Sequence, residues 1–333
     1  MGKNYFWIDV LKAVAAFSVI ILHVSGSLLN EFNDKEQWWV GNLYDSLVRF
    51  CVPVFVMISG VLLLGRDESL SNFLKKRFTR LLFPFFLWSI IYLILKIDYN
   101  LPIQEIVLES FKKLKNGTEF HLWYIYMIIG IYLFIPIINK WIIHANKKEI
   151  LYFILIWLLI IILKLPVFEK LYTRIDLRYF SGFLGYLILG YYLNHYLQLK
   201  RYMALGFFFV GYIVTIFATC YISSINRELN EQFYDYLSLN VIIASVGVFM
   251  YFKNYTIENK FVSKIIVILS KYSYGIYLSH ILVLTLFSKI EFTYRLFNFW
   301  IGIPIISISC LLLSLMLTYI ISKIPIIGKY ISG

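Results

Sequence analysis

Residues 6–29 decide the fold, and they read FWIDVLKAVAAFSVIILHVSGSLL. Apart from Asp9, Lys12 and His23, the stretch consists of apolar or small residues. A helix of this length reaches about 36 Å, enough to cross the roughly 30 Å hydrocarbon core of a bilayer. The charges inside the apolar stretch, and the lack of a small-residue cleavage site, argue against a removable signal peptide. We therefore expect a membrane-spanning helix here.

Apolar runs of similar length recur along all 333 residues, of which 60% are hydrophobic and 15% charged. Soluble domains contain about 25% charged residues and could not bury this much apolar surface. The composition excludes a soluble enzyme, a disordered chain and a disulfide scaffold. We predict an all-α, polytopic integral membrane protein, a single domain over residues 1–333 with about ten transmembrane helices. The predicted spans are Phe6–Leu29, Leu43–Leu64, Arg80–Ile97, His121–Asn139, Ile150–Phe168, Tyr179–Leu197, Met203–Ile222, Tyr236–Phe252, Ile265–Ser288 and Asn298–Ser322.

The distribution of basic residues predicts the orientation. The even-numbered connections hold most of the Lys and Arg, which places both termini in the cytoplasm by the positive-inside rule. The net charge of +12 is concentrated in these short connections, where it suits anionic lipid head groups rather than nucleic acid. The three cysteines lie in apolar runs without metal-ligand spacing, so we expect no metal site.

The first predicted helix carries a polar stripe. Lys12 and His23 are eleven residues apart, close to three whole turns, so they share one face about 16 Å apart along the axis. Asp9 lies one turn below Lys12 and can pair with it. Charges inside a bilayer are costly and usually face a cavity. The alternatives are an ion pair that snorkels to the interface and a structural histidine.

The second predicted span contains Asp45 and Arg49, one turn apart near its outer end, at about the depth of His23. They form either part of a site or an ion pair that fixes helix packing. A kink is expected at Pro53, and Ser59-Gly60 predicts close contact with another helix.

Three further groups of residues are candidates for binding. Arg77 and Arg80, with Lys76 beside them, suit a phosphate-bearing ligand at a cytoplasmic mouth, although basic residues there also serve topology. Trp123 and Tyr124 open the fourth span at the outer surface, where aromatic interfacial belts are common. Ser273, Tyr277 and His280 recur at i, i+4 and i+7, so we expect them to face the interior.

In their order along the chain, these motifs resemble the acyltransferase 3 family of polytopic membrane acyltransferases. The resemblance rests on Lys12 and His23 with ten residues between them, Val52-Pro53-Val54-Phe55 through Ser59-Gly60, Arg77 to Arg80, His121-Leu122-Trp123-Tyr124, and Tyr274-Gly275-Ile276-Tyr277-Leu278 with His280. It covers nearly the whole chain. Many members have Arg where this chain has Lys12, which keeps the charge but loses the guanidinium fork.

The resemblance implies transfer of an acyl group, most often acetyl, from cytoplasmic acetyl-CoA to a hydroxyl of a surface polysaccharide or lipid-linked glycan. It also implies a bacterial plasma membrane and a membrane-only form without a fused extracytoplasmic domain. We expect acetyl-CoA to dock at Arg77, Arg80 and Lys76 and to extend past Lys12, with Asp9 beside it. His23 would act as general base or as transient acyl carrier.

Several roles around this scheme stay open. Arg49, Tyr277 and His280 are candidates to stabilise the oxyanion, and Trp123 and Tyr124 to stack on a sugar. The alternative function is a transporter or flippase for a lipid-linked saccharide, which would need no acyl-CoA. A non-catalytic subunit of a polymer-export complex is a third interpretation.

Overall fold

The computed structural model describes residues 6–29, 32, 35–165, 182–325 and 328, and all regular structure in them is helical. This confirms the predicted all-α class. The helices are α1 (Phe6–Gly26), α2 (Glu36–Val48), α3 (Cys51–Leu63), α4 (Leu70–Lys96), α5 (Ile103–Asn116), α6 (Trp123–His144), α7 (Lys147–Leu163), α8 (Leu184–Tyr196), α9 (Arg201–Asn226), α10 (Leu239–Phe252), α11 (Lys260–Lys289) and α12 (Phe299–Ser322). Short 3-10 turns are η1 (Phe120–Leu122), η4 (Gln232–Tyr234) and η5 (Tyr294–Leu296).

Eight helical stretches of the described chain are long and apolar enough to cross a membrane. They include α2 and α3 as one stretch, whereas α7 has 17 residues and α8 (Leu184–Tyr196) has 13. The predicted span ends at Phe168 and Tyr179 lie outside the described residues. A multi-pass membrane protein is therefore supported, while the count of about ten spans and the cytoplasmic termini stay predictions.

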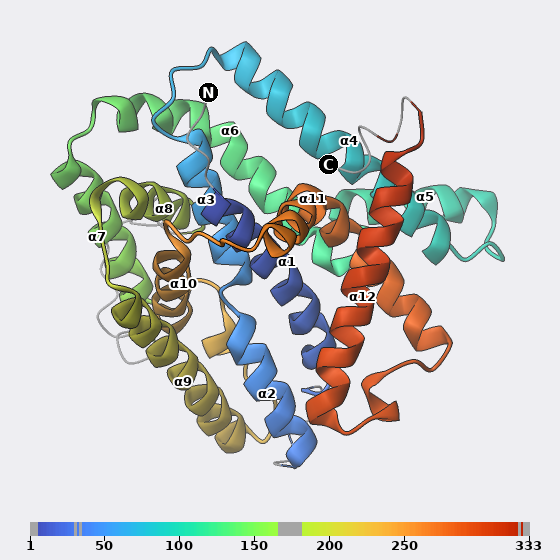
Figure 1. Ribbon diagram of the computed structural model, residues 1–333. Helices are drawn as coiled ribbons and strands as arrows, with labels where there is room; N and C mark the ends of the chain where they lie inside the picture. The colour runs from blue at the N-terminus through green and yellow to red at the C-terminus, as the bar shows by residue number, and fades with distance from the viewer. Residues whose placement is uncertain (1–5, 30–31, 33–34, 166–181, 326–327, 329–333) are drawn as a thin grey trace.

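Helix α1 is the central helix of the bundle (Figure 1). It contacts α2, α3, α10, α11 and α12. Its small residues Ala13, Ala15, Ala16 and Ser18 are all buried, which lets neighbouring backbones approach closely. The polar stripe of this helix is consequently held inside the protein.

The break in the second predicted span lies upstream of the proline. Helix α2 ends at Val48 and α3 begins at Cys51, so Pro53 stands in the first turn of α3, where its missing N–H costs nothing. The kink expected from Pro53 is present, but it lies at Arg49 and Phe50, three to four residues before the proline. The physical reason is that a proline ring clashes with the carbonyl four residues before it, here that of Arg49.

Glycines allow α3 and α8 to pack almost backbone to backbone. A Cβ on Gly60 would lie 1.9 Å from the carbonyl oxygen of Leu187, and one on Gly190 would lie 2.2 Å from that of Met57. The predicted close contact at Ser59-Gly60 is thus confirmed. This packing fixes the wall of the bundle that α3 contributes to the site.

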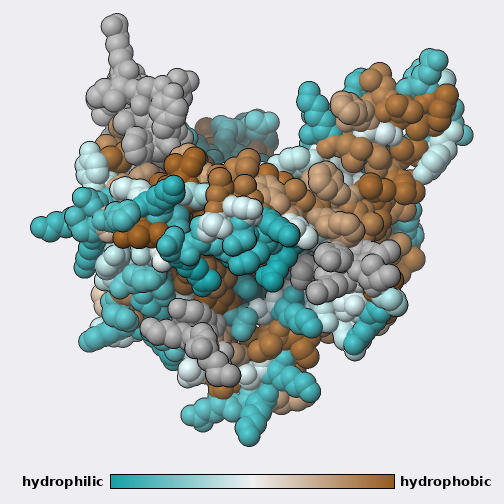
Figure 2. All heavy atoms as spheres, turned by 90° about the horizontal axis from the view of Figure 1, so that it is seen from above, coloured by the Kyte–Doolittle hydropathy of each residue, from teal (hydrophilic) through white to brown (hydrophobic). Residues whose placement is uncertain are grey.

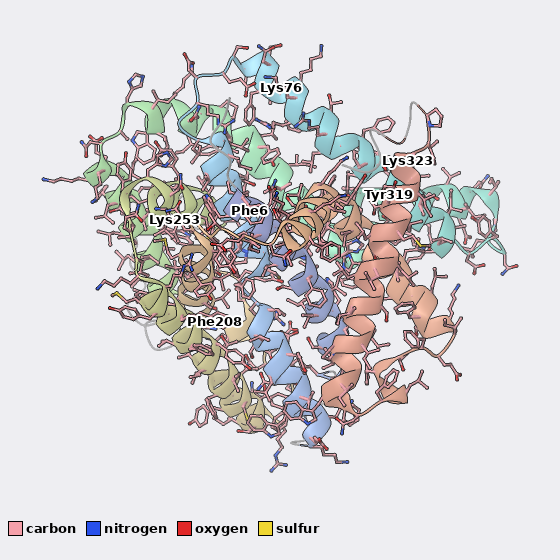
Figure 3. All side chains as sticks on the ribbon, viewed as in Figure 1. Phe6, Lys76, Phe208, Lys253, Tyr319 and Lys323 are labelled. Atoms are coloured by element: carbon pink, nitrogen blue, oxygen red, sulfur yellow. The ribbon has the colours of Figure 1, made fainter. Side chains whose placement is uncertain are left out.

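Helix α4 begins at Leu70, ten residues before the predicted span, so Lys76 and Arg77 lie within a helix rather than in a connection. Figure 3 shows Lys76 and Lys323 near the same end of the bundle, and Figure 2 looks down on that end, where hydrophilic side chains cover much of the surface. The sequence prediction missed α5, which has no buried residue and is too short to span a bilayer.

Candidate functional site

Three histidine rings meet in the middle of the bundle. His23 comes from α1, His121 from η1 and His280 from α11. The ring of His280 lies 5.2 Å from that of His23 and 5.1 Å from that of His121, measured between centroids. We call these three residues the histidine cluster. Its members are far apart in the sequence and are brought together only by the packing of three elements.

His121 is the member that the sequence prediction did not include among the site residues. Its side chain is 1% exposed, and neither ring nitrogen has a well-formed hydrogen bond among the described residues. One ring nitrogen interacts with the carbonyl of Leu278, whose oxygen has two lone pairs and also accepts a hydrogen bond from Tyr92. The other nitrogen has no partner among the described residues. A buried polar atom in that state is costly, and such atoms often serve a function. The sequence signal that could have identified His121 as a site residue is the His121-Leu122-Trp123-Tyr124 motif of the family resemblance.

The ring of His280 is oriented by a backbone hydrogen bond. Its Nδ1 lies 2.6 Å from the carbonyl oxygen of Tyr277. Because a carbonyl can only accept, Nδ1 carries the proton and Nε2 keeps a lone pair. This Nε2 is buried and has no hydrogen-bond partner among the described residues. His280 is therefore held as a base-competent tautomer beside His23.

Tyr92 of α4 fastens α11 next to the histidine cluster. Its hydroxyl donates to the carbonyl of Leu278 at 2.7 Å and accepts from the backbone N–H of Leu282 at 3.2 Å. In a regular helix, the N–H of Leu282 would bond the carbonyl of Leu278 directly. The Tyr92 hydroxyl lies between these two groups and bridges them. The insertion sets the local position of His280.

An inner cavity of about 300 Å³ lies on one side of the histidine cluster. Four basic residues line it, namely Lys12, Arg77, Arg80 and Lys271. Its other lining residues are Phe55, Ile58, Ser59, Leu62, Leu81, Tyr124, Ile128, Tyr132, Ser270, Ser273, Tyr274 and Tyr277. The predicted inward face of α11 is confirmed, because Ser273 and Tyr277 are buried here and His280 is fully buried beyond them. The cavity combines positive charge with tyrosine rings.

A surface pocket of about 450 Å³ adjoins this region at the start of α4. Arg77 lines both the surface pocket and the inner cavity, whereas Lys76 lines only the surface pocket. Glu68 lies 2.6 Å from Lys76 Nζ and 3.9 Å from Arg77. The hydrogen bond from Lys76 holds the pKa of Glu68 below its usual value, and the nearby Arg77 charge adds to this.

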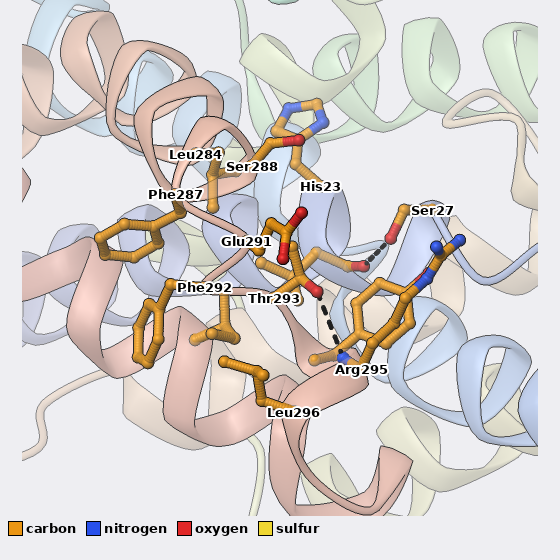
Figure 4. A pocket seen from close by; sticks show the side chains of 13 residues that line it. His23, Ser27, Leu284, Phe287, Ser288, Glu291, Phe292, Thr293, Arg295 and Leu296 are labelled. Atoms are coloured by element: carbon orange, nitrogen blue, oxygen red, sulfur yellow. Dashed lines mark hydrogen bonds between the residues drawn. The ribbon is translucent and has the colours of Figure 1, made fainter.

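An outer cavity of about 650 Å³ lies on the other side of the histidine cluster (Figure 4). It is lined by His23, Val24, Ser27, Leu284, Phe287, Ser288, Glu291, Phe292, Thr293, Tyr294, Arg295, Leu296 and Ile306. His23 thus borders the outer cavity, and Lys12, further back along the same helix, borders the inner one. Tyr277 connects the inner cavity to the histidine cluster. It lines the inner cavity, and its ring lies 5.5 Å from that of His121.

A family model described as an acyltransferase domain matches residues 5–319. The chain belongs to the acyltransferase 3 family. Comparison with curated proteins and with solved structures gave no match. The protein is accordingly a membrane acyltransferase by family. Its candidate active site consists of the histidine cluster, the outer cavity that His23 lines and the inner cavity that Tyr277 lines.

In this acyltransferase, Asp9 interacts electrostatically with Lys12, as its position one turn away predicts, but the two side chains are not within ion-pair distance. The Oδ1 of Asp9 accepts a hydrogen bond from Ser270 Oγ at 2.6 Å. Asp9 therefore links α1 to α11. Lys12 remains available to the inner cavity.

Arg49 lines neither cavity of the acyltransferase, although it lies close enough to His23 for the two side chains to interact electrostatically. It forms an ion pair with Asp45, and its guanidinium lies 4.0 Å from the centroid of the Tyr234 ring. Asp45 is 1% exposed, so the pair is buried. These contacts favour the helix-packing interpretation of Arg49 over the oxyanion one, since its charge is already matched.

Trp123 and Tyr124 do not line the outer cavity of the acyltransferase. The Trp123 ring is stacked on Tyr236 with centroids 5.7 Å apart, and Tyr124 lines the inner cavity. Their placement at the outer surface and their role in stacking on a sugar stay predictions. Just before α6, Phe120 packs against His23 with ring centroids 5.2 Å apart, so this helix begins beside the histidine cluster.

Proposed function

We propose that the protein transfers an acetyl group from cytoplasmic acetyl-CoA to a hydroxyl of a saccharide on the opposite side of the membrane. The observation that carries the proposal is the pair of cavities on either side of the histidine cluster. Donor and acceptor dissolve on opposite sides of a bilayer, so an enzyme that joins them needs two separate approaches to one reacting group.

The inner approach suits the donor. Coenzyme A carries phosphates at its nucleotide end, and Arg77, Arg80 and Lys76 offer the cations that bind them. Since Arg77 lines both pockets, the nucleotide would occupy the surface pocket and the pantetheine arm the inner cavity. Lys12 would then contact the arm, and the thioester would reach Tyr277 and the histidine cluster.

The chemistry at the histidine cluster follows from the positions of its members. His23 takes the proton of the acceptor hydroxyl while the acceptor oxygen attacks the thioester carbonyl. Collapse of the tetrahedral intermediate breaks the C–S bond, and the proton passes to the sulfur of coenzyme A. His121 is the candidate to stabilise the oxyanion, because its ring lies 5.1 Å from that of His280 and 5.5 Å from that of Tyr277, which lines the inner cavity. The hydroxyl of Tyr277 is engaged, because it donates to the backbone carbonyl of His121.

A variant of this route uses His23 as a transient acyl carrier. Its ring nitrogen would attack the thioester, release coenzyme A as the thiol, and pass the acetyl group to the acceptor hydroxyl. The two routes share the same residues and the same net reaction.

Reconstituted vesicles test the proposal. Protein in proteoliposomes receives radiolabelled acetyl-CoA on one side and a methyl glycoside on the other, and release of the coenzyme A thiol is measured together with label on the glycoside. We expect both products in equal amounts. Movement of a lipid-linked saccharide without any thioester cleavage would favour the flippase alternative and overturn the proposal.

A further inference from the structure

We propose that the outer cavity binds an acidic saccharide, with Glu291 recognising hydroxyls near the reacting one and Arg295 recognising the carboxylate or phosphate. This inference rests on the proposed function, because it assigns the acceptor of that reaction. Both residues line the cavity that His23 borders. In Figure 4 the Glu291 carboxylate points into the space beside His23, and the Arg295 side chain reaches toward Ser27.

The backbone at Glu291 adopts a conformation that disfavours a glutamate. Its φ is +58°, in the left-handed region, where glycine or asparagine is usual. The N–H of Phe292 bonds the carbonyl of Phe287 at 2.9 Å, and the N–H of Glu291 bonds that of Ser288 at 3.2 Å. This pair of bonds is the Schellman motif that ends a helix, and Glu291 holds the position at which glycine is most common.

The charge of Glu291 is equally unfavourable for the helix. A carboxylate at the end of α11 meets the negative end of the helix dipole, where cations are favoured. Glu291 is exposed, and the ion pairs among the described residues do not include its carboxylate. The left-handed backbone alone does not mark a function, since Arg227 at the end of α9 has a φ of +57°. Glu291 differs from Arg227 because it lines the cavity that His23 borders.

Arg295 completes the site from the adjoining turn. It lies in η5, whose start is capped by Thr293, another residue of the cavity lining. Its guanidinium pairs with no carboxylate of the described residues, Glu291 included. Two opposite charges that face one cavity without pairing leave both free for a ligand. A carboxylate accepts hydroxyl hydrogens, and a guanidinium binds an anionic group in bidentate fashion.

The volume and walls of the cavity fit a saccharide. About 650 Å³ is within the range of small-molecule sites, and Phe287, Phe292 and Tyr294 supply aromatic surface beside the charges. A neutral sugar would leave Arg295 without a partner. The acceptor class is therefore a saccharide with an acidic substituent close to the acetylated hydroxyl.

Matched acceptors test the inference in proteoliposomes supplied with acetyl-CoA. The probes are methyl β-glucoside, methyl β-glucuronide and glucose 1-phosphate, which separate a neutral ring from a carboxylate and a phosphate. We expect kcat/KM to be about tenfold or more higher for at least one acidic probe than for the glucoside, the factor typical of one charge-assisted contact. Arg295→Gln should abolish this preference, while Arg227→Gln, at an exposed arginine outside the cavity, should preserve it.

Glu291 has a test that separates binding from structure. Glu291→Gly should raise the melting temperature, because it relieves the left-handed strain, and should lower kcat/KM for all three probes. Equal use of neutral and acidic probes, an unchanged preference in Arg295→Gln, or acetylation of none of them would overturn the inference. In the first two outcomes, acetylation of the probes itself would show that the proposed function survives. If no probe is acetylated, cleavage of acetyl-CoA by the wild type would confine the failure to the assigned acceptor, and the absence of cleavage would show that the proposed function has failed.

Discussion

The imidazole of His23 is stacked on that of His280, with ring centroids 5.2 Å apart and the ring planes 26° apart. Two imidazolium ions at this separation would repel each other strongly in a buried setting. The pair therefore accommodates one proton more readily than two. A proton taken from an acceptor by His23 is best tolerated while His280 is neutral, as its hydrogen bond to Tyr277 allows.

His23→Ala should reduce acetyl transfer by about 10²–10⁴, the usual contribution of a general base, and by more if His23 carries the acyl group. The measurement is coenzyme A release by purified protein that elutes as the wild type does in size-exclusion chromatography. His144→Ala, at an exposed histidine near the end of α6, is the matched control and should be as active as the wild type. Normal transfer by the His23 variant would remove this residue from the mechanism.

His121→Leu should separate catalysis from stability. Leucine removes two buried nitrogen atoms that lack well-formed hydrogen bonds, each costing about 1–3 kcal/mol, and leaves the backbone carbonyl that accepts from Tyr277. We expect a melting temperature equal to or above that of the wild type and a kcat lowered about 10²-fold, as for the loss of one oxyanion donor. A stable variant with full activity would show that His121 only fills space.

Exchanging Arg77 and Arg80 together for Gln should mainly raise the KM for acetyl-CoA. Two charge-assisted contacts of about 1.5–3 kcal/mol each correspond to at least a tenfold increase. Lys75→Gln tests the same helix at an exposed position that lines neither the inner cavity nor the surface pocket, and should leave this KM unchanged. If the double variant lowers kcat alone, the docking role is wrong.

Glu68→Gln should tighten donor binding. Glu68 pairs with Lys76 and lies near Arg77, so it competes with the phosphates for these cations. We expect the KM for acetyl-CoA to fall about two- to fivefold at low ionic strength and to become more sensitive to salt. Because the pKa of Glu68 is held below its usual value, the carboxylate is charged throughout pH 6–8, and the wild-type KM should not change in that range on account of Glu68. An increased KM would show that Glu68 orders the site rather than competing for it.

Gly60→Ala should destabilise the protein, because its Cβ would lie 1.9 Å from the carbonyl oxygen of Leu187. The shift of α3 from α8 that relieves this overlap costs about 1–3 kcal/mol or more. Gly130→Ala is the control, since no atom lies within 4 Å of its added Cβ, and it should be neutral or stabilising by about 0.5–1 kcal/mol. Thermal melting in detergent measures both. A wild-type melting temperature for Gly60→Ala would contradict the close packing.

Much of the fold was predictable from local pattern. Apolar runs long enough for a bilayer indicate helices wherever they occur, and the eleven-residue spacing of Lys12 and His23 places them on one face without knowledge of any neighbour. The prediction was less accurate where a helix boundary depends on backbone sterics or on contact with water. The proline ring of Pro53 places the break at Arg49, not at the proline itself. Helix α4 extends back to Leu70 through polar residues, which a search for apolar runs does not include.

The sequence by itself determined the membrane-spanning helices and the polar stripe of α1, because both follow from side chains along one segment. Only the tertiary structure decided which residues complete the site. His121 and His280 are brought to His23 by the packing of separate elements, and the charge of Arg49 is paired with Asp45 beside the Tyr234 ring. The left-handed backbone of Glu291 beside the outer cavity likewise appears only in the structure. Glutamate disfavours a positive φ, so its presence in the sequence gives no sign of this conformation.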